Sequence, residues 1–311
     1  MNFEDEKKYL AVDIGSNAMR ASVAILDHAN DLEVIETFRY PLRLGGEAFT
    51  QGEFSPGKIK QTTKAFHQLK DAISAHELED IKVVATSAVR DSRNSDELIS
   101  KVKDKVGFDI EVINGELEAD LIQKAIGTVV DLSEKKSLLV DIGGGSTEFS
   151  LVENESVVFS TSYPCGTLRF LEEQKASKLI SEIDAMTDDL KSKLDQFNPD
   201  HTQYDLCIGT GGNLRRMGKL RNLFFNRSAH KITQQELSAI KIEVAKLSLR
   251  QRVIYLTMRE DRADVIVPAM EIIESLLIKF ELPEILLPNV GLKEGIFIDQ
   301  IGDVPRNIIL N

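Results

Sequence analysis

The chain has 311 residues, 42% of them hydrophobic and 28% charged, so it can bury a sizeable interior and is not a disordered composition. Its net charge of −12 argues against general binding to nucleic acid or to an anionic membrane, although a local cluster can still bind an anion. No apolar run approaches the roughly 18 residues of a membrane span, and the N-terminus lacks the pattern of a secretory signal. Cys165 and Cys207 lie far apart and are expected to be reduced thiols, which predicts a cytoplasmic protein.

The first part of the chain alternates strand and helix patterns. Apolar, β-branched runs predict strands at Tyr9–Asp13, Ala18–Leu26, Leu32–Phe38, Val83–Thr86 and Ile110–Ile113. Ser55-Pro56 predicts a helix start, because an N-cap is followed by proline at the first helical position. A second helix is expected after Asn94-Ser95, where acids in the first turn suit the helix dipole. Alternation of this kind predicts an α/β layer fold.

A polar stretch at Thr128–Lys136 interrupts this pattern, which restarts at Ser137. Further strands are predicted at Leu138–Asp141, Glu148–Val152, Val157–Tyr163 and Leu206–Gly209. Helices are predicted at Ala176–Phe197, after a capping box at Thr233–Glu236, and at Asp264–Phe280. We therefore expect two domains, 1–126 and 127–311, with the last helix able to pack back on the first domain.

Both halves begin with the same pattern of an apolar run, Asp-Ile-Gly, small polar residues and a second apolar run. The two aspartates, Asp13 and Asp141, lie 128 residues apart. Because the motif, the flanking strands and the subsequent order all match, the sequence indicates a duplicated architecture.

The second of these hairpins contains more glycine than a turn needs. Gly143, Gly144 and Gly145 each cost backbone entropy on folding, and glycine's other use is to let successive N–H groups converge on an anion. Ser146 and Thr147 add hydroxyl donors, so a phosphate is the expected guest.

The first hairpin leaves two interpretations open. Ser16 and Asn17 can simply complete a tight turn, or they can bind phosphate as the second hairpin is expected to do. A third glycine group, Gly211 and Gly212, also follows an apolar strand and precedes a helical pattern. In a chain with two phosphate hairpins, it is expected to form the floor for the rest of the ligand.

The strand-terminal acids complete this picture. A carboxylate next to a bound phosphate is repelled unless a divalent cation lies between them. Asp141, Glu148 and Asp13 are therefore predicted to hold Mg²⁺ directly or through water, since this ion prefers carboxylates, waters and phosphates.

One basic stretch opposes the acidic balance of the chain. Its basic residues fall within 17 residues that contain no acid: Arg215, Arg216, Lys219, Arg221, Arg227 and Lys231. They can form a solvated helix and loop, or a track for a polyphosphorylated ligand.

The motifs together resemble the superfamily of acetate and sugar kinases, heat-shock chaperones and actin. In detail the chain is similar to the exopolyphosphatase and guanosine pentaphosphate phosphohydrolase family. The resemblance rests on AVDIGSNAMR (11–20), ATSAVRDSRN (85–94), INGELEADLI (113–122), LVDIGGGSTE (139–148), CGTLRF (165–170), GTGGNL (209–214), RADVIVPAMEII (262–273) and GLKEGIF (291–297).

This resemblance implies an α/β fold of two actin-like (ribonuclease H-like) domains with an interdomain cleft. It implies hydrolysis of the terminal phosphoanhydride of inorganic polyphosphate or guanosine pentaphosphate, with Mg²⁺. Glu118 falls on the family's catalytic glutamate, which activates water, and Arg90 falls on its phosphate-binding arginine. Gly143–Ser146 matches the phosphate loop, Asp141 and Glu148 match metal-associated acids, and Arg20 and Arg262 match arginines around the cleft.

Without the resemblance, two of these residues have ordinary explanations. Glu118 and Glu116 can be acids that suit the dipole of a helix start, and Arg90 can form a surface ion pair. The chain also departs from the family pattern: Asp120 stands where the family commonly has arginine, and Lys293 replaces the arginine of a GLREG motif. It resembles the short form of the family, which lacks a helical C-terminal domain.

Two other functions stay open at this stage, a small-molecule kinase and a non-hydrolytic nucleotide-binding sensor on the same fold. The sequence does not choose between the two family substrates or fix the oligomeric state, with a homodimer among the alternatives. The acidic charge and the short basic stretch favour short polyphosphate chains, with Arg215 and Arg216 as ligand contacts beyond the catalytic pocket.

Overall fold

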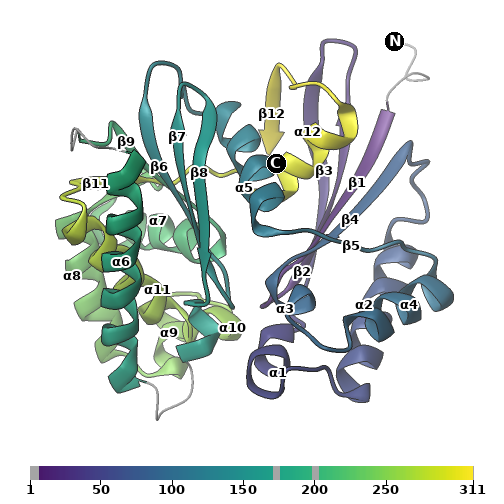
Figure 1. Cartoon of the computed structure of the whole chain (residues 1–311). Coiled ribbons are helices and arrows are strands. Elements are labelled where there is room, and N and C mark those ends of the chain that lie inside the picture. The colour runs from purple at the N-terminus through teal and green to yellow at the C-terminus, as the bar shows by residue number, and fades with distance from the viewer. Residues whose placement is uncertain (1–6, 171–175, 198–202, 311) are drawn as a thin grey trace. The chain divides into compact units, whose positions relative to one another are not determined.

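The computed structural model describes residues 7–170, 176–197 and 203–310. Packing divides the chain into two compact units: unit 1 is Met1–Asp131 with Val290–Asn311, and unit 2 is Leu132–Asn289. Each unit has its own six-stranded mixed sheet and its own helices (Figure 1). The first boundary lies inside the polar stretch 128–136, and the last 22 residues return to unit 1. Within the described ranges, no helix is both long enough and apolar enough to cross a membrane.

The sheet of unit 1 has the order β12-β3-β2-β1-β4-β5. Its strands are β1 Lys7–Ile14, β2 Met19–Leu26, β3 Asp31–Tyr40, β4 Asp80–Ala85, β5 Glu111–Val112 and β12 Asn307–Leu310. Strands β1 to β3 form antiparallel hairpins, whereas β4 runs parallel to β1 and β5 parallel to β4. The strands expected in this part of the chain are thus confirmed, with β5 shorter than predicted. The edge strand β12, which runs parallel to β3, was not predicted.

The helices of unit 1 are α1 Leu44–Gln51, α2 Pro56–Ala72, α3 Ser87–Arg90, α4 Ser95–Val106, α5 Gly115–Gly127 and α12 Leu292–Ile301. The start of α2 is confirmed, because the Ser55 hydroxyl accepts the N–H of Lys58 and Pro56 opens the helix. Helix α12 packs closely on α5: a Cβ built on Gly295 would lie 2.1 Å from the carbonyl oxygen of Leu121. Only glycine allows this approach between the two helices.

The sheet of unit 2 has the order β10-β11-β9-β6-β7-β8. Its strands are β6 Lys136–Ile142, β7 Thr147–Glu153, β8 Ser156–Tyr163, β9 Leu206–Thr210, β10 Lys231–Thr233 and β11 Glu284–Leu286. Strands β6 to β8 form antiparallel hairpins, β9 runs parallel to β6 and β11 parallel to β9. The series β8-β7-β6-β9-β11 therefore repeats the series β3-β2-β1-β4-β5 of unit 1, in order and direction. The duplicated architecture expected from the two hairpins is present.

The helices of unit 2 are η1 Thr167–Phe170 (a 3₁₀-helix), α6 Ala176–Phe197, α7 Gly212–Phe225, α8 Gln234–Lys246, α9 Leu249–Tyr255, α10 Glu260–Ala263 and α11 Ile266–Lys279. The predicted capping box of α8 is confirmed: the Thr233 hydroxyl accepts the N–H of Glu236, whose carboxylate accepts the N–H of Thr233. The bounds of α6 match the prediction, and α11 begins two residues later than expected.

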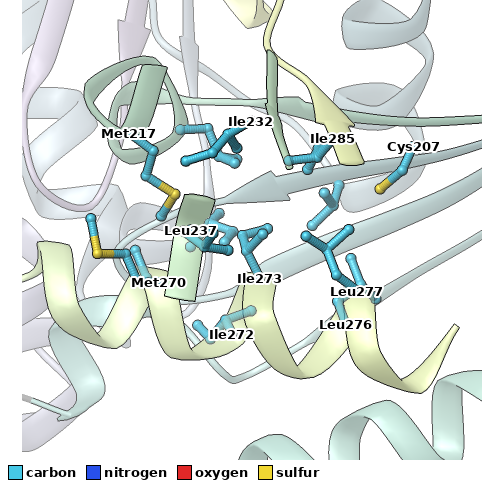
Figure 2. Close-up of a cluster of buried hydrophobic side chains, with 14 of the residues drawn as sticks. Cys207, Met217, Ile232, Leu237, Met270, Ile272, Ile273, Leu276, Leu277 and Ile285 are labelled. Atoms are coloured by element: carbon cyan, nitrogen blue, oxygen red, sulfur yellow. The ribbon is translucent and has the colours of Figure 1, made fainter. Parts of the chain in front are cut away.

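The core of unit 2 lies between the sheet and α11, to which α7 and α8 add side chains (Figure 2). Met217, Leu237 and Ile273 are completely buried in it. Cys207 belongs to this core, and both cysteines are free thiols, as the sequence predicted. Burial raises the pKa of each thiol to about 12, so neither is a reactive thiolate.

Candidate functional site

The glycine loop of unit 2, Gly143–Ser146, follows β6 and is held from one side by η1. The N–H of Gly143 donates to the carbonyl of Ser146 at 3.0 Å, which closes the loop. The three glycine carbonyls accept from Thr167 N–H, Leu168 N–H and Arg169 Nε, at 3.2, 2.8 and 2.5 Å in chain order. The N–H groups of Gly144, Gly145 and Ser146 donate to no acceptor in the described part of the chain. The loop therefore offers its donors to a ligand while its acceptors are occupied.

Gly166 lies against this loop and leaves room for it. A Cβ at Gly166 would lie 2.2 Å from the carbonyl carbon of Gly145, a distance at which no side chain fits. Neither Gly166 nor Arg169 was predicted as a site residue. The signal was available in the CGTLRF stretch, but only the fold shows that this stretch supports the glycine loop.

Two carboxylates face each other across the hairpin that carries the loop. Asp141 near the end of β6 is directly opposite Glu148 on β7, so both side chains lie on the same face of the sheet. The Thr210 hydroxyl donates to Asp141 at 2.7 Å. Glu148 is buried and accepts from the hydroxyls of Ser146 and Ser162.

This pair fits a hard divalent cation. Like charges directly opposite each other repel, and bound Mg²⁺ would relieve the repulsion while taking carboxylate oxygens as ligands. Asp141 and Glu148 are thus the residues of unit 2 that could hold the ion.

The third glycine group, Gly211 and Gly212, lies next to Asp141. Gly211 has φ +96° and a Cβ there would lie 2.8 Å from a carboxylate oxygen of Asp141, so glycine is needed for both backbone and space. Gly212 begins α7, whose N-terminal end favours an anion. Arg262 donates to the side chain of buried Asn213 at 3.0 Å, and Asn213 donates to Thr167 at 3.5 Å. This network connects Arg262 to the support of the glycine loop.

Three of the six basic residues of the basic stretch form ion pairs with glutamates of unit 2. Buried Arg221 donates to both carboxylate oxygens of Glu236, and Arg227 donates to one of them. Lys231 pairs with Glu284 at 2.8 Å. The acids that neutralise the stretch come from outside it, which its own sequence could not reveal.

The other three cations, Arg215, Arg216 and Lys219, take no part in these pairs. The Arg216 guanidinium donates to the carbonyl of Leu256, and burial lowers the pKa of Arg216 from its ordinary value. Arg216 thus holds the segment after α9 through one of its guanidinium nitrogens.

The equivalent hairpin of unit 1 carries the opposite charge across from its aspartate. Asp13 on β1 is directly opposite Arg20 on β2, and the two side chains form an ion pair at 3.1 Å. The position that holds a second acid, Glu148, in unit 2 thus holds a cation in unit 1. Asp13 therefore has a protein counter-charge that the register does not provide for Asp141.

The turn of this hairpin contacts the start of α3 and the start of α1. The hydroxyls of Ser16 and Ser87 lie 2.9 Å apart, and the carbonyls of Ser16 and Asn17 accept backbone N–H groups from the start of α1. Ser16 and Asn17 are both buried. These contacts show that the turn has a structural role, whether or not it also binds phosphate.

Arg90 and Glu118 lie together in unit 1. Arg90 is held by donation to the carbonyl of Ile113 at 2.9 Å, and its guanidinium lies 3.6 Å from the carboxylate of Glu118. Asn114 caps α5 by accepting the N–H of Leu117, which fixes the first turn that carries Glu118. Glu118 is only 6% exposed, whereas Glu116 of the same turn is exposed. An acid that merely suits the helix dipole is expected to be exposed, so Glu116 fits that description better than Glu118.

The two departures from the family pattern have local partners. Asp120 forms an i,i+4 ion pair with Lys124 at 2.7 Å on the surface of α5. Lys293 donates to the Ser22 hydroxyl of β2 at 2.6 Å, and Glu294 accepts the N–H of Gly291 to cap α12. The charge of Asp120 is thus offset within its own helix, and the GLKEG segment holds α12 in unit 1.

The chain is similar to one family of known proteins. The model of the Ppx/GppA phosphatase family matches residues 23–303. A guanosine-5'-triphosphate,3'-diphosphate pyrophosphatase of Photobacterium profundum is 26% identical over 216 residues, which cover 68% of this chain and 43% of that protein. The chain therefore spans less than half of the length of that curated relative.

Two solved structures share the fold. An exopolyphosphatase from Cytophaga hutchinsonii has a TM-score of 0.85 at 21% identity, covering 96% of this chain and 99% of its own. The Aquifex aeolicus member of the Ppx/GppA family has a TM-score of 0.76 at 22% identity, covering 95% and 98%. The chain thus has the expected α/β fold of two actin-like domains.

Proposed function

The chain belongs to the Ppx/GppA phosphatase family, and we propose that it hydrolyses the terminal phosphoanhydride of inorganic polyphosphate or guanosine pentaphosphate with Mg²⁺. The observation that carries this proposal is the glycine loop Gly143–Ser146, whose open N–H groups lie beside the acid pair Asp141 and Glu148. The name of the Photobacterium protein supports guanosine pentaphosphate as a substrate. The name of the Cytophaga protein supports polyphosphate.

Unit 2 is proposed to bind the phosphate that is removed. The N–H groups of Gly144, Gly145 and Ser146 donate to its oxygens. The predicted hydroxyl donor Thr147 is buried and donates instead to the carbonyl of Cys165 at 2.6 Å. Gly211 and Gly212 at the start of α7 bind the part of the substrate next to this terminal phosphate. Mg²⁺ held by Asp141 and Glu148 would neutralise charge that develops on the phosphate oxygens. Asp13 is the weaker metal candidate, because Arg20 already balances it.

Unit 1 is proposed to supply the base. Glu118 takes a proton from water, the water oxygen forms a bond to the terminal phosphorus, and the bridging P–O bond breaks. The products are inorganic phosphate and a chain one phosphate shorter. Arg90, held beside Glu118 by the carbonyl of Ile113, balances charge on the phosphate and orients the carboxylate. Positioning and charge neutralisation account for most of the catalysis of such reactions.

Substrate length is proposed to be limited by charge. Long polyphosphate needs an extended positive track, but Arg221, Arg227 and Lys231 are committed to glutamates of unit 2. Arg215 and Arg216 are the remaining candidates for contacts beyond the terminal phosphate, together with Arg262. Short chains, or a nucleotide, are therefore the expected substrates.

The test is phosphate release from a panel of substrates. With Mg²⁺, we expect release from tripolyphosphate or guanosine pentaphosphate, and a lower kcat/KM per chain end on polyphosphate of hundreds of units. Excess chelator should abolish the activity. Release from neither substrate, or full activity in chelator, contradicts the proposal. Phosphate transfer to an added sugar or acid in preference to water would favour the alternative of a small-molecule kinase.

A further inference from the structure

Helices α2 and α4 of unit 1 pack side by side (Figure 1). A concave surface lies between them. Its cavity has a volume of about 810 Å³, within the usual range of small-ligand sites. None of the residues assigned above to the phosphate site lines it. We name this cavity the α2–α4 groove.

The α2–α4 groove is unusually positive for a chain of net charge −12. Lys60 and Lys64 lie one turn apart on α2, and Lys101 faces the same cavity from α4. All three are exposed, and none forms an ion pair with another residue in the described ranges. By contrast, the neighbouring Lys103 pairs with Asp109.

One acid, Glu97, also lines the groove. Its carboxylate accepts from the side chain of Asn94 at 3.5 Å and forms no ion pair with the groove lysines. Three cations against one acid leave a net positive charge in the groove. Because the surface is concave, the positive electrostatic potential is strongest inside the groove, where it attracts an anion.

The groove also offers a hydrocarbon surface. Pro56 and buried Ile59 contribute apolar atoms, Thr63 adds its methyl group, and the stems of the lysines add more. The N-terminal end of α2 lies in the same wall and favours negative charge. An inorganic anion would use only the charges, whereas a molecule with a flat ring and a phosphate group uses both surfaces.

We propose that the α2–α4 groove binds a nucleotide, with its base against Pro56 and Ile59 and its phosphates at Lys60, Lys64 and Lys101. This site is separate from the phosphate loops and does not depend on the proposed hydrolysis. Phosphate contacts from lysine act as point charges, and contact of the ring with the apolar wall adds the preference for a nucleotide.

The test uses the full chain in excess chelator, so that hydrolysis does not interfere, with GTP and tripolyphosphate as probes of similar charge. We expect GTP to slow hydrogen exchange in the backbone of residues 57–67 and 97–101. The reversal Lys60→Glu with Lys64→Glu should weaken this protection about tenfold at low salt. The control Lys7→Glu with Lys246→Glu makes the same change in net charge at surface pairs elsewhere and should leave it unchanged.

Tripolyphosphate should protect the groove several-fold more weakly than GTP. The proposal would be overturned if the two probes protected the groove equally, or if neither protected these segments. It would also be overturned if both double variants lost the same amount of protection by GTP. Hydrogen exchange of the groove and phosphate release are separate measurements, so the proposed hydrolysis can fail while this site stands, and the reverse.

Discussion

At the scale of single residues, Gly166 has the most direct effect on the proposed phosphate site. It lies against the glycine loop, and the loop's carbonyls bond to the residues that immediately follow Gly166. A methyl group there would overlap the backbone of Gly145, so the loop or η1 must move.

We therefore expect Gly166→Ala to lower kcat/KM by at least tenfold, because the N–H groups that receive the phosphate lose their alignment. The control is Gly46→Ala, since a Cβ at Gly46 meets nothing within 4 Å. Steady-state kinetics of both variants on tripolyphosphate measures the difference in kcat/KM. Unchanged kinetics in a correctly folded Gly166→Ala variant would show that the loop does not bind the substrate.

The acid pair gives a second prediction at this scale. Asp141→Asn removes one carboxylate from the pair, and we expect the Mg²⁺ concentration for half-maximal activity to rise by about 10- to 100-fold. Asp13→Asn is the matched change in the equivalent hairpin, and it should raise the requirement less because Arg20 neutralises Asp13. A magnesium titration of both variants checks this, and equal shifts would count against a metal site confined to unit 2.

Most of the candidate site could be predicted from sequence where one short segment carries it. The Asp-Ile-Gly hairpins give the acids and the glycine loop by themselves, because strand, turn and strand are adjacent in the chain. Arg169, Thr210 and Asn213 were missed, since each acts through a partner tens of residues away. The pairing of Arg221 with Glu236 was missed for the same reason.

At the scale of elements, this buried pair joins α7 to α8. Burial by itself would raise the pKa of Glu236, but hydrogen bonds from Arg221, from the Thr233 N–H and from Arg227 outweigh it and lower the pKa to about 2. The folded protein therefore binds fewer protons than the unfolded chain at this carboxyl. The resulting stability is present above about pH 4.5 and is lost as the pH falls toward 2.

Glu236→Gln should accordingly lower the free energy of unfolding at pH 7 by on the order of 3 kcal/mol. The difference from the parent chain should shrink between pH 5 and pH 2, where the parent loses the same charge. Urea unfolding at pH 7 and pH 3 measures it, with the exposed Glu243→Gln as control. A difference that stays constant over this range would show that the charge of Glu236 is not the cause.

The fold was predictable where elements are long and periodic. The hairpin strands and helices α6 and α11 lie within a few residues of their predicted bounds, and α2 begins at the predicted residue. The short strands β10, β11 and β12 have only three or four residues each, too few for a clear alternation. Helices α3 and α10 have four residues each, and only the tertiary fold selects them.

At the scale of the whole molecule, two units of one topology carry different charges at the same position. Opposite the strand-terminal aspartate, unit 1 has Arg20 and unit 2 has Glu148. We infer that duplication supplied one scaffold twice and that the units then specialised. In the proposed function, unit 2 would bind phosphate and metal, and unit 1 would supply Glu118, which is buried beside Arg90.

The proposed mechanism depends most on Glu118, which would be the base of the phosphoanhydride hydrolysis. The most direct measurement is the turnover of Glu118→Gln on tripolyphosphate and guanosine pentaphosphate with saturating Mg²⁺, beside Glu116→Gln from the exposed side of the same helical turn. Glutamine keeps the size and hydrogen bonding of glutamate but cannot accept the proton. We predict that kcat falls by about 10²- to 10⁴-fold for Glu118→Gln with little change in KM, and that Glu116→Gln keeps near-full turnover. Near-full turnover of the Glu118→Gln variant would show that Glu118 is not the base.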